Sequence, residues 1–216
     1  MADLPKEFFR RVDEADDELF YEFPRKVVHI DDGAIAAVRG MYADRLPPGG
    51  EILDLMSSWR SHLPESLGFK QVVGLGLNRP EMEDNPALTG AVIHNVNRDP
   101  RLPFADASFD GAVMTVSVQY LTRPVEVFAE VGRVLRMGGP FIVTFSNRMF
   151  PTKAIALWQA ASDGQRIEIV KRYFADSRIF ERIETFDLSR RPGAPSDPIW
   201  GVAGYRTGAP ERRPQG

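Results

Sequence analysis

The sequence contains no cysteine, which excludes disulfide bonds, thiolate catalysis and cysteine-ligated zinc. It has only three histidines. None of them is spaced as in the His-x-x-x-His pattern of a metal site, so we predict that the protein holds no metal. Basic residues form no cluster beyond Arg190-Arg191 and Arg212-Arg213, and the formal net charge is −3. Nucleic acid and anionic membranes are therefore not expected as partners.

Long apolar runs are also absent. No stretch is fit to cross a membrane, and the acidic, amphipathic N-terminal region lacks the apolar centre of a signal peptide. The composition is otherwise ordinary for a soluble globular protein, with 43% hydrophobic and 26% charged residues. We therefore expect a cytoplasmic protein. Its 216 residues suit one α/β domain better than two, and the choice between monomer and homodimer stays open.

Two short apolar segments, 51–55 and 71–77, organise the rest of the chain. Both are rich in Val, Ile and Leu and lack clean alternation, which is typical of strands buried on both faces of a parallel sheet. The connection between them has the length of a βαβ crossover with a short helix, which predicts a doubly wound α/β fold. Ligands of such sheets bind beyond the carboxyl ends of the strands, so 54–58 and 76–78 are expected to line the site.

The same apolar patterning extends along the chain. We expect further strands at 91–96, 109–117, 140–146, 182–188 and 199–205, and helices at 6–18, 33–46, 125–137 and 152–174, the last broken at Asp163-Gly164. The short Pro/Gly-rich link 191–198 predicts that the last two strands form an antiparallel hairpin. The expected fold is thus a seven-stranded, mostly parallel sheet in a single domain, with an N-terminal helical cap or lid (1–46), a core (50–207) and a flexible tail (208–216).

The N-terminal region carries an acidic run, 13–18, which we interpret as a solvated helix face. Five aromatic residues, at positions 8, 9, 20, 21 and 23, lie around this run. Two interpretations stand side by side: the aromatic residues form a lid over a pocket, or they only dock the segment on the domain. His29 lies between this segment and the first long helix, where a structural role competes with a role in the pocket.

Two longer motifs lie downstream. Residues 102–110 read Leu-Pro-Phe-Ala-Asp-Ala-Ser-Phe-Asp, and residues 130–139 read Glu-Val-Gly-Arg-Val-Leu-Arg-Met-Gly-Gly. On these motifs the stretch 50–147 resembles the Rossmann-like (class I) S-adenosylmethionine-dependent methyltransferases, of the type 11 kind. The resemblance implies S-adenosylmethionine as the cofactor and a small-molecule methyl acceptor.

The first cofactor motif departs from the family pattern. The family has Asp-x-Gly-x-Gly-x-Gly after the first strand, whereas here Asp54 is followed by Met56, Ser58 and Arg60 at the glycine positions. Glycine tolerates positive φ and close approach of the backbone to a ligand. The added Cβ atoms therefore predict an outward shift of the cofactor or a changed loop path. Hydroxyl groups in this loop, Ser57 among them, are expected to offset the loss by donating hydrogen bonds.

A second departure concerns the ribose. Gly76 stands where the family usually ends its second strand with an acid that binds both ribose hydroxyls. Loss of that contact is expected to cost about 1.5–3 kcal/mol. We predict Asn78 as the substitute partner, and Glu81 resembles a family position on the following helix.

The resemblance implies a role for polar residues at each strand end. The predicted cofactor contacts are Asp54, Met56, Ser57, Ser58, Asn78, Asn97, Asp99, Thr115 and Ser117; the predicted acceptor contacts are Gln119 and Arg148; the catalytic candidates are Tyr120, His29 and Tyr21. Turn formation before Pro100 is the competing interpretation for Asn97 and Asp99. Packing at a helix start competes for Gln119 and Tyr120.

No residue stands out as a general base. Methyl transfer needs one only if the acceptor carries a proton that must be removed. The sequence therefore favours an acceptor that is nucleophilic unaided, such as a thiolate, a ring nitrogen or an ionised phenol. Two other functions remain: a non-catalytic binding or regulatory protein that has lost cofactor affinity, and an enzyme that uses the cofactor without transferring its methyl group.

Overall fold

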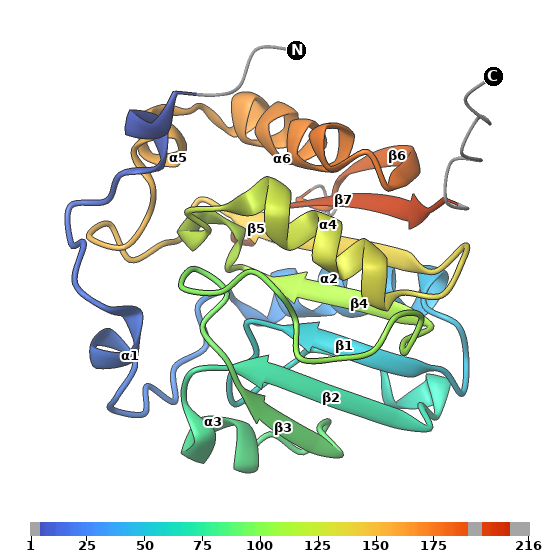
Figure 1. Cartoon of the computed structure of the whole chain (residues 1–216). Helices are drawn as coiled ribbons and strands as arrows, with labels where there is room; N and C mark the ends of the chain where they lie inside the picture. Colours follow the sequence, from blue (N-terminus) through green and yellow to red (C-terminus); the bar gives the residue numbers. More distant parts are fainter. Residues whose placement is uncertain (1–4, 190–195, 208–216) are drawn as a thin grey trace, which may run out of the picture.

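The structure is a computed structural model that describes residues 5–189 and 196–207. Its centre is one seven-stranded sheet with the strand order β3-β2-β1-β4-β5-β7-β6 (Figure 1). The strands are β1 Glu51–Leu55, β2 Gln71–Gly76, β3 Gly90–Ile93, β4 Gly111–Thr115, β5 Pro140–Ser146, β6 Phe180–Asp187 and β7 Ile199–Arg206. β1 to β5 pair in parallel, and β7 pairs antiparallel with both β5 and β6. The expected doubly wound sheet with a C-terminal antiparallel hairpin is confirmed.

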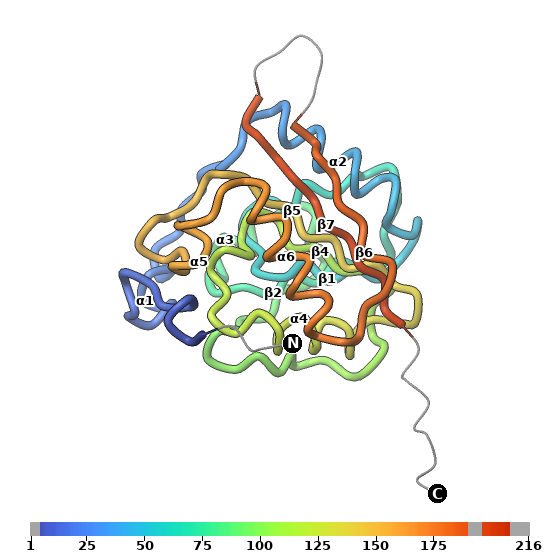
Figure 2. The backbone as a smooth tube through the Cα atoms, turned by 90° about the horizontal axis from the view of Figure 1, so that it is seen from above, coloured from blue at the N-terminus to red at the C-terminus, as the bar shows by residue number. Residues whose placement is uncertain are grey.

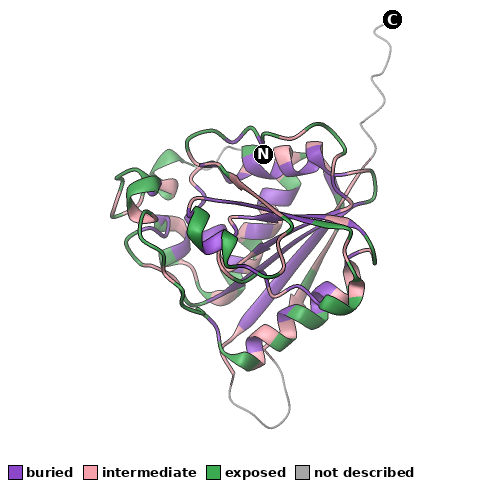
Figure 3. Ribbon diagram, turned by 90° about the horizontal axis from the view of Figure 1, so that it is seen from below, coloured by how far each residue is buried: buried purple, intermediate pink, exposed green. Residues whose placement is uncertain are grey.

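Helices cover both faces of this sheet. They are α1 Asp17–Phe20, α2 Asp32–Arg45, α3 Arg79–Glu83, α4 Pro124–Val134, α5 Ala156–Ala160 and α6 Asp163–Ser177, with 3-10 turns at Lys6–Phe9, Glu65–Leu67 and Val118–Tyr120. α2 lies against one face, and α4 and α6 lie against the other (Figure 2). The strands β1, β2, β4, β5 and β7 are mostly buried, whereas the edge strands β3 and β6 are largely half-buried or exposed (Figure 3).

The strands supply side chains to both layers in turn, because successive residues of a strand point to opposite faces. Ile52 packs with the α2 layer, whereas Leu53 and Leu55 pack with the α4 and α6 layer. Asp54 therefore lies on the α2 side. On that side the buried Tyr42 hydroxyl contacts the Thr115 hydroxyl at 2.7 Å, which ties α2 to the carboxyl end of β4.

Two expected helices are wrong. In place of a helix over 6–18 the chain forms only the turn Lys6–Phe9 and the short α1. Asp13 and Asp16 accept hydrogen bonds from the backbone N–H groups of Ala15 and Glu18, and such local bonds compete with helix formation. Between β1 and β2 the described chain has no α-helix, only the turn Glu65–Leu67.

Other boundaries shift by a few residues. The break expected at Asp163-Gly164 lies just before that pair, because Ser162 caps α6 with a full capping box. Gly138 adopts the positive φ of 76° expected after α4. Most of the expected loop 191–198 and the whole expected tail 208–216 lie outside the described residues.

Candidate active site

A pocket lies at the carboxyl edge of the parallel strands, and the N-terminal chain covers it. The chain from Arg11 to His29, here called the lid segment, runs along this edge in dark blue (Figure 1). The ends of β1, β2, β3 and β4 line the pocket floor, while Asp17, Tyr21, Arg25 and His29 of the lid segment line its cover. The cavity volume of this pocket is about 130 Å³.

The loop after β1 passes over the end of β2. Met56 has a positive φ of 55°, which is uncommon for a residue with a long side chain. The Ser57 N–H then donates to the Leu75 carbonyl oxygen at 2.9 Å. As a result the Ser57 carbonyl oxygen lies only 2.3 Å from where a Cβ on Gly76 would be.

The loop without glycines after β1 and the glycine at position 76 are therefore structurally linked. Without glycines the loop follows a path that crosses the end of β2, and this path leaves no room for a side chain at Gly76. An acid at position 76 and this loop exclude each other.

Asp54 lies beneath this loop, where it is 3% exposed. Its carboxylate accepts hydrogen bonds from the Ser57 hydroxyl at 2.6 Å and from the Ser61 hydroxyl at 2.5 Å. Burial nevertheless raises the pKa of Asp54 to about 6. Asp54 lines a smaller cavity that shares Met56, Ser57 and other residues with the main pocket.

This raised pKa makes stability depend on pH. The folded-state pKa of Asp54 exceeds its unfolded value of 3.8. The contribution of Asp54 to the free energy of unfolding is therefore fully present below about pH 4 and is lost as pH rises towards about 6. We expect Asp54→Asn to remove this loss, which amounts to about 3 kcal/mol over the window. Urea unfolding at several pH values between 4 and 7.5 measures it. The exposed Asp44→Asn serves as the control, and a profile of Asp54→Asn parallel to the wild type would contradict the assignment.

Asn78, predicted to replace the ribose acid, uses its side chain within the protein. Its Oδ1 accepts from the Glu81 N–H at 2.9 Å and so caps α3, and its amide donates to the Tyr21 carbonyl oxygen at 2.8 Å. Glu81 is better placed. It is 6% exposed, it lines the pocket, and its carboxylate accepts hydrogen bonds from the Ser58 hydroxyl and the Arg25 N–H.

The end of β3 contributes Asn97 to the pocket but not Asp99. The Asn97 amide donates to Asp17 at 2.8 Å and to the Tyr120 carbonyl oxygen at 3.0 Å, so it joins the lid segment to the floor. The Asp99 carboxylate accepts from the backbone N–H of Arg101 at 2.9 Å. This local bond is the turn-forming role considered for Asp99.

The end of β4 brings Thr115, Ser117 and Tyr120 to the pocket. The Ser117 hydroxyl oxygen is buried and has no hydrogen-bond partner among the described residues. The Tyr120 hydroxyl accepts from the Phe150 N–H at 2.8 Å, and the two rings stack with centroids 6.1 Å apart. Burial raises the pKa of Tyr120, so this phenol stays protonated at neutral pH.

Two predicted acceptor contacts lie away from the pocket lining. Gln119 is fully buried and donates to the Val116 carbonyl oxygen at 3.0 Å, which matches the packing interpretation. Arg148 is 61% exposed and forms an ion pair with Asp197 at 2.7 Å.

The lid segment brings Tyr21 and His29 to the pocket together. Burial is the main cause that raises the pKa of Tyr21 and lowers the pKa of His29. Tyr21 therefore keeps its proton at neutral pH and His29 is uncharged. The His29 ring meets the edge of Phe150 with centroids 5.1 Å apart. Of the three catalytic candidates, His29 alone has a free base form at neutral pH.

Charged residues that the sequence analysis missed hold the lid segment in place. Asp17 is 5% exposed and forms ion pairs with Arg11 at 2.6 Å and with Lys153 at 3.3 Å. The fully buried Lys153 ammonium also pairs with Asp13 at 3.1 Å and donates to the Ala15 carbonyl oxygen at 2.7 Å. We call Asp13, Asp17 and Lys153 the lid anchor. The interpretation of the acidic run as a solvated face is thus wrong at Asp17.

Residues 5–189 and 196–207 contain no group of three or more His, Asp or Glu side chains arranged to hold a metal ion. In the same ranges no helix has the length and apolar character needed to cross a membrane.

Residues 59–143 match a family model described as a methyltransferase domain, of type 11. Over 43 residues the chain is 42% identical to the biotin biosynthesis bifunctional protein BioHC of Teredinibacter turnerae. That match covers 20% of the chain and 8% of the relative, so the chain spans only a small part of that protein.

Solved structures share the fold. An S-adenosylmethionine-dependent methyltransferase of Thermotoga maritima, a possible histamine N-methyltransferase, has a TM-score of 0.55 at 17% identity, with 81% of this chain and 88% of that chain covered. One from Aquifex aeolicus has a TM-score of 0.57 at 15% identity, with 81% and 92% covered. One from Mesorhizobium loti has a TM-score of 0.53 at 17% identity, with 79% and 98% covered. Residues 59–143 thus match a methyltransferase domain, and the solved structures show that the chain has the fold of S-adenosylmethionine-dependent methyltransferases.

Proposed function

We propose that the protein methylates a small-molecule acceptor inside the pocket that the lid segment covers. The observation that supports this proposal is that the lid segment covers the pocket. The lid segment and the lid anchor close the pocket above the strand ends, so an acceptor has to be small enough to enter beneath them. A macromolecular acceptor would have to displace the buried Asp17 and Lys153.

The floor of the pocket offers groups that fit the cofactor. Glu81 is a buried carboxylate whose oxygens have lone pairs left to accept from ribose hydroxyls. Ser117 brings a hydroxyl that has no hydrogen-bond partner among the residues the structure describes. Asp54 lies in the adjoining cavity, where an ammonium group would favour its ionised form. We assign the ribose contact to Glu81 in place of the missing acid at position 76.

S-adenosylmethionine, when bound, supplies an electrophilic methyl group, so the protein has mainly to hold the acceptor in line with it. Tyr21, Tyr120 and Phe150 form the aromatic walls around the acceptor space. Both phenols keep their protons, since burial raises the pKa of each. They act as hydrogen-bond donors and packing surfaces rather than as bases. His29 is the residue available to accept a proton from the acceptor.

Calorimetric titration with S-adenosylmethionine and with S-adenosylhomocysteine tests the proposal. We expect dissociation constants near or below about 10 μM, roughly −7 kcal/mol. Glu81→Gln is expected to weaken both by about 10- to 100-fold through loss of a charge-assisted contact. The exposed Glu126→Gln on α4 is the matched control. No heat and no thermal shift at millimolar ligand would overturn the proposal and favour a non-catalytic binding protein.

A further inference from the structure

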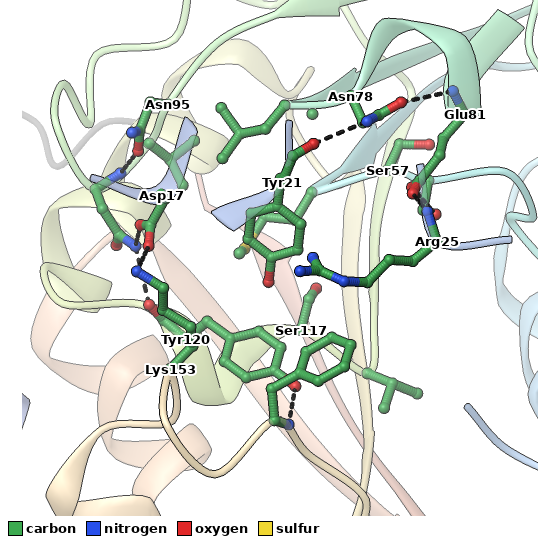
Figure 4. Close-up of a pocket in the computed structure, with 18 of the residues that line it drawn as sticks. Asp17, Tyr21, Arg25, Ser57, Asn78, Glu81, Asn95, Ser117, Tyr120 and Lys153 are labelled. Atoms are coloured by element: carbon green, nitrogen blue, oxygen red, sulfur yellow. Dashed lines mark hydrogen bonds and ion pairs between the residues drawn. The ribbon is translucent and has the colours of Figure 1, made fainter. Parts of the chain in front are cut away.

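Arg25 presents a positive charge to the pocket, and no ion pair with it forms among residues 5–189 and 196–207. Its backbone N–H donates to Glu81, which fixes this point of the lid segment above α3. Its side chain extends into the pocket between Tyr21 and Ser117 (Figure 4). The Nη1 atom is buried and has no hydrogen-bond partner, and no ion pair joins the guanidinium to any residue in the described ranges.

Aromatic rings hold the guanidinium in position. Its Cζ lies 4.1 Å from the centre of the Phe20 ring, 5.6 Å from that of Phe150 and 5.9 Å from that of Tyr21. These contacts offset part of the cost of removing the cation from water. They provide no acceptor in the plane of the N–H groups, and a buried donor without an acceptor is unfavourable. The rings orient the guanidinium and leave its N–H groups available to a hydrogen-bond acceptor.

No carboxylate of the described residues forms an ion pair with the Arg25 guanidinium. Asp17 pairs with Arg11 and Lys153. Glu81 accepts from the Ser58 hydroxyl and from the backbone of Arg25, and it lies in no ion pair within the described residues. The buried Nη1 donor of Arg25 is therefore left to be satisfied by a ligand that enters the pocket. The planar fork of a guanidinium matches a carboxylate with two parallel hydrogen bonds.

We propose that Arg25 binds the carboxylate of a ligand in this pocket. The inference rests on the proposed function, because the pocket is the one assigned to cofactor and acceptor. Two ligands bring this chemistry: the cofactor through its methionyl carboxylate, or an acceptor that is itself a carboxylic acid. Arg25 lies among the aromatic walls of the acceptor space, so both sources have to be tested.

The cofactor arm compares S-adenosylmethionine with its decarboxylated form by calorimetry. If Arg25 binds the methionyl carboxylate, the wild type prefers the intact cofactor by about 10- to 100-fold, and Arg25→Gln loses this preference. Arg25→Lys keeps part of it, because the charge remains without the fork. Arg79→Gln, an exposed arginine on α3, is the matched control and keeps the full preference.

The acceptor arm uses benzoate and its uncharged isostere benzamide as probes, with and without S-adenosylhomocysteine. If Arg25 binds the acceptor, benzoate binds the wild type at least 10-fold more tightly than benzamide, and Arg25→Gln removes the difference while cofactor selectivity stays intact. A positive result in either arm supports the proposal and shows whether the carboxylate belongs to the cofactor or to the acceptor.

Equal weakening of charged and uncharged ligands by Arg25→Gln would show that Arg25 only packs the lid segment, and it would overturn the proposal. So would unchanged selectivity in both arms. A wild type that binds no cofactor would instead overturn the proposed function. The benzoate comparison without cofactor would still decide the role of Arg25.

Discussion

Gly76→Ala is expected to lower the free energy of unfolding by about 3 kcal/mol, at the upper end of the cost of overpacking a core. The new Cβ would lie 2.3 Å from the Ser57 carbonyl oxygen, which is a backbone atom and moves only if the whole loop moves. Urea unfolding measures the loss, and the same displacement of the loop is expected to weaken cofactor binding.

Gly74→Ala is the matched control on the same strand. Its Cβ would lie 2.5 Å from a methyl group of Leu88, at the end of a side chain that can rotate away. We expect a cost of about 1 kcal/mol or less there. Gly76→Asp, which restores the acid usual in the family, should destabilise further and bind the cofactor no better. Tighter binding by Gly76→Asp at unchanged stability would contradict the loop geometry.

Asp17→Ala is expected to release the lid segment while the sheet stays folded. The substitution leaves the fully buried Lys153 with Asp13 as its remaining ionic partner, and breaking a buried ion pair from one side costs about 3–5 kcal/mol. Because the lid segment can leave the surface and let Lys153 reach water, this energy should appear as opening rather than as global unfolding.

Amide hydrogen exchange measures this opening. We expect exchange over residues 11–29 to rise by about 100-fold or more, with little change in the sheet. Glu18→Ala is the control, since Glu18 pairs with Arg98 at the surface, where such pairs contribute less than about 1 kcal/mol. Equal protection of the lid segment in both variants would show that the lid anchor does not hold it.

The sheet was predictable because its signal is local. Continuous apolar runs such as 140–146 mark strands buried on both faces. The place of the pocket followed from the fold class alone, since parallel strands bring their carboxyl ends together.

The cover of the pocket was not predictable in the same way. The contact of Asp17 with Asn97 spans 80 residues, and that of Ala15 with Lys153 spans 138. Nothing local distinguishes the buried Asp17 from its solvated neighbours in the acidic run. No sequence motif marks Arg25 either, because the three aromatic rings that surround its guanidinium come together only in the folded chain.

The position of the lid segment in the chain has a consequence for folding. Residues 11–29 are synthesised before the sheet, yet their partners Asn97 and Lys153 follow only after β3 and β5. Closing loops of this length has to await a formed sheet, so the lid segment should dock as the last step of folding. Its undocking is then the first step of unfolding. Under the proposed function, the same short excursion would let a small acceptor in and its methylated product out while the core stays intact.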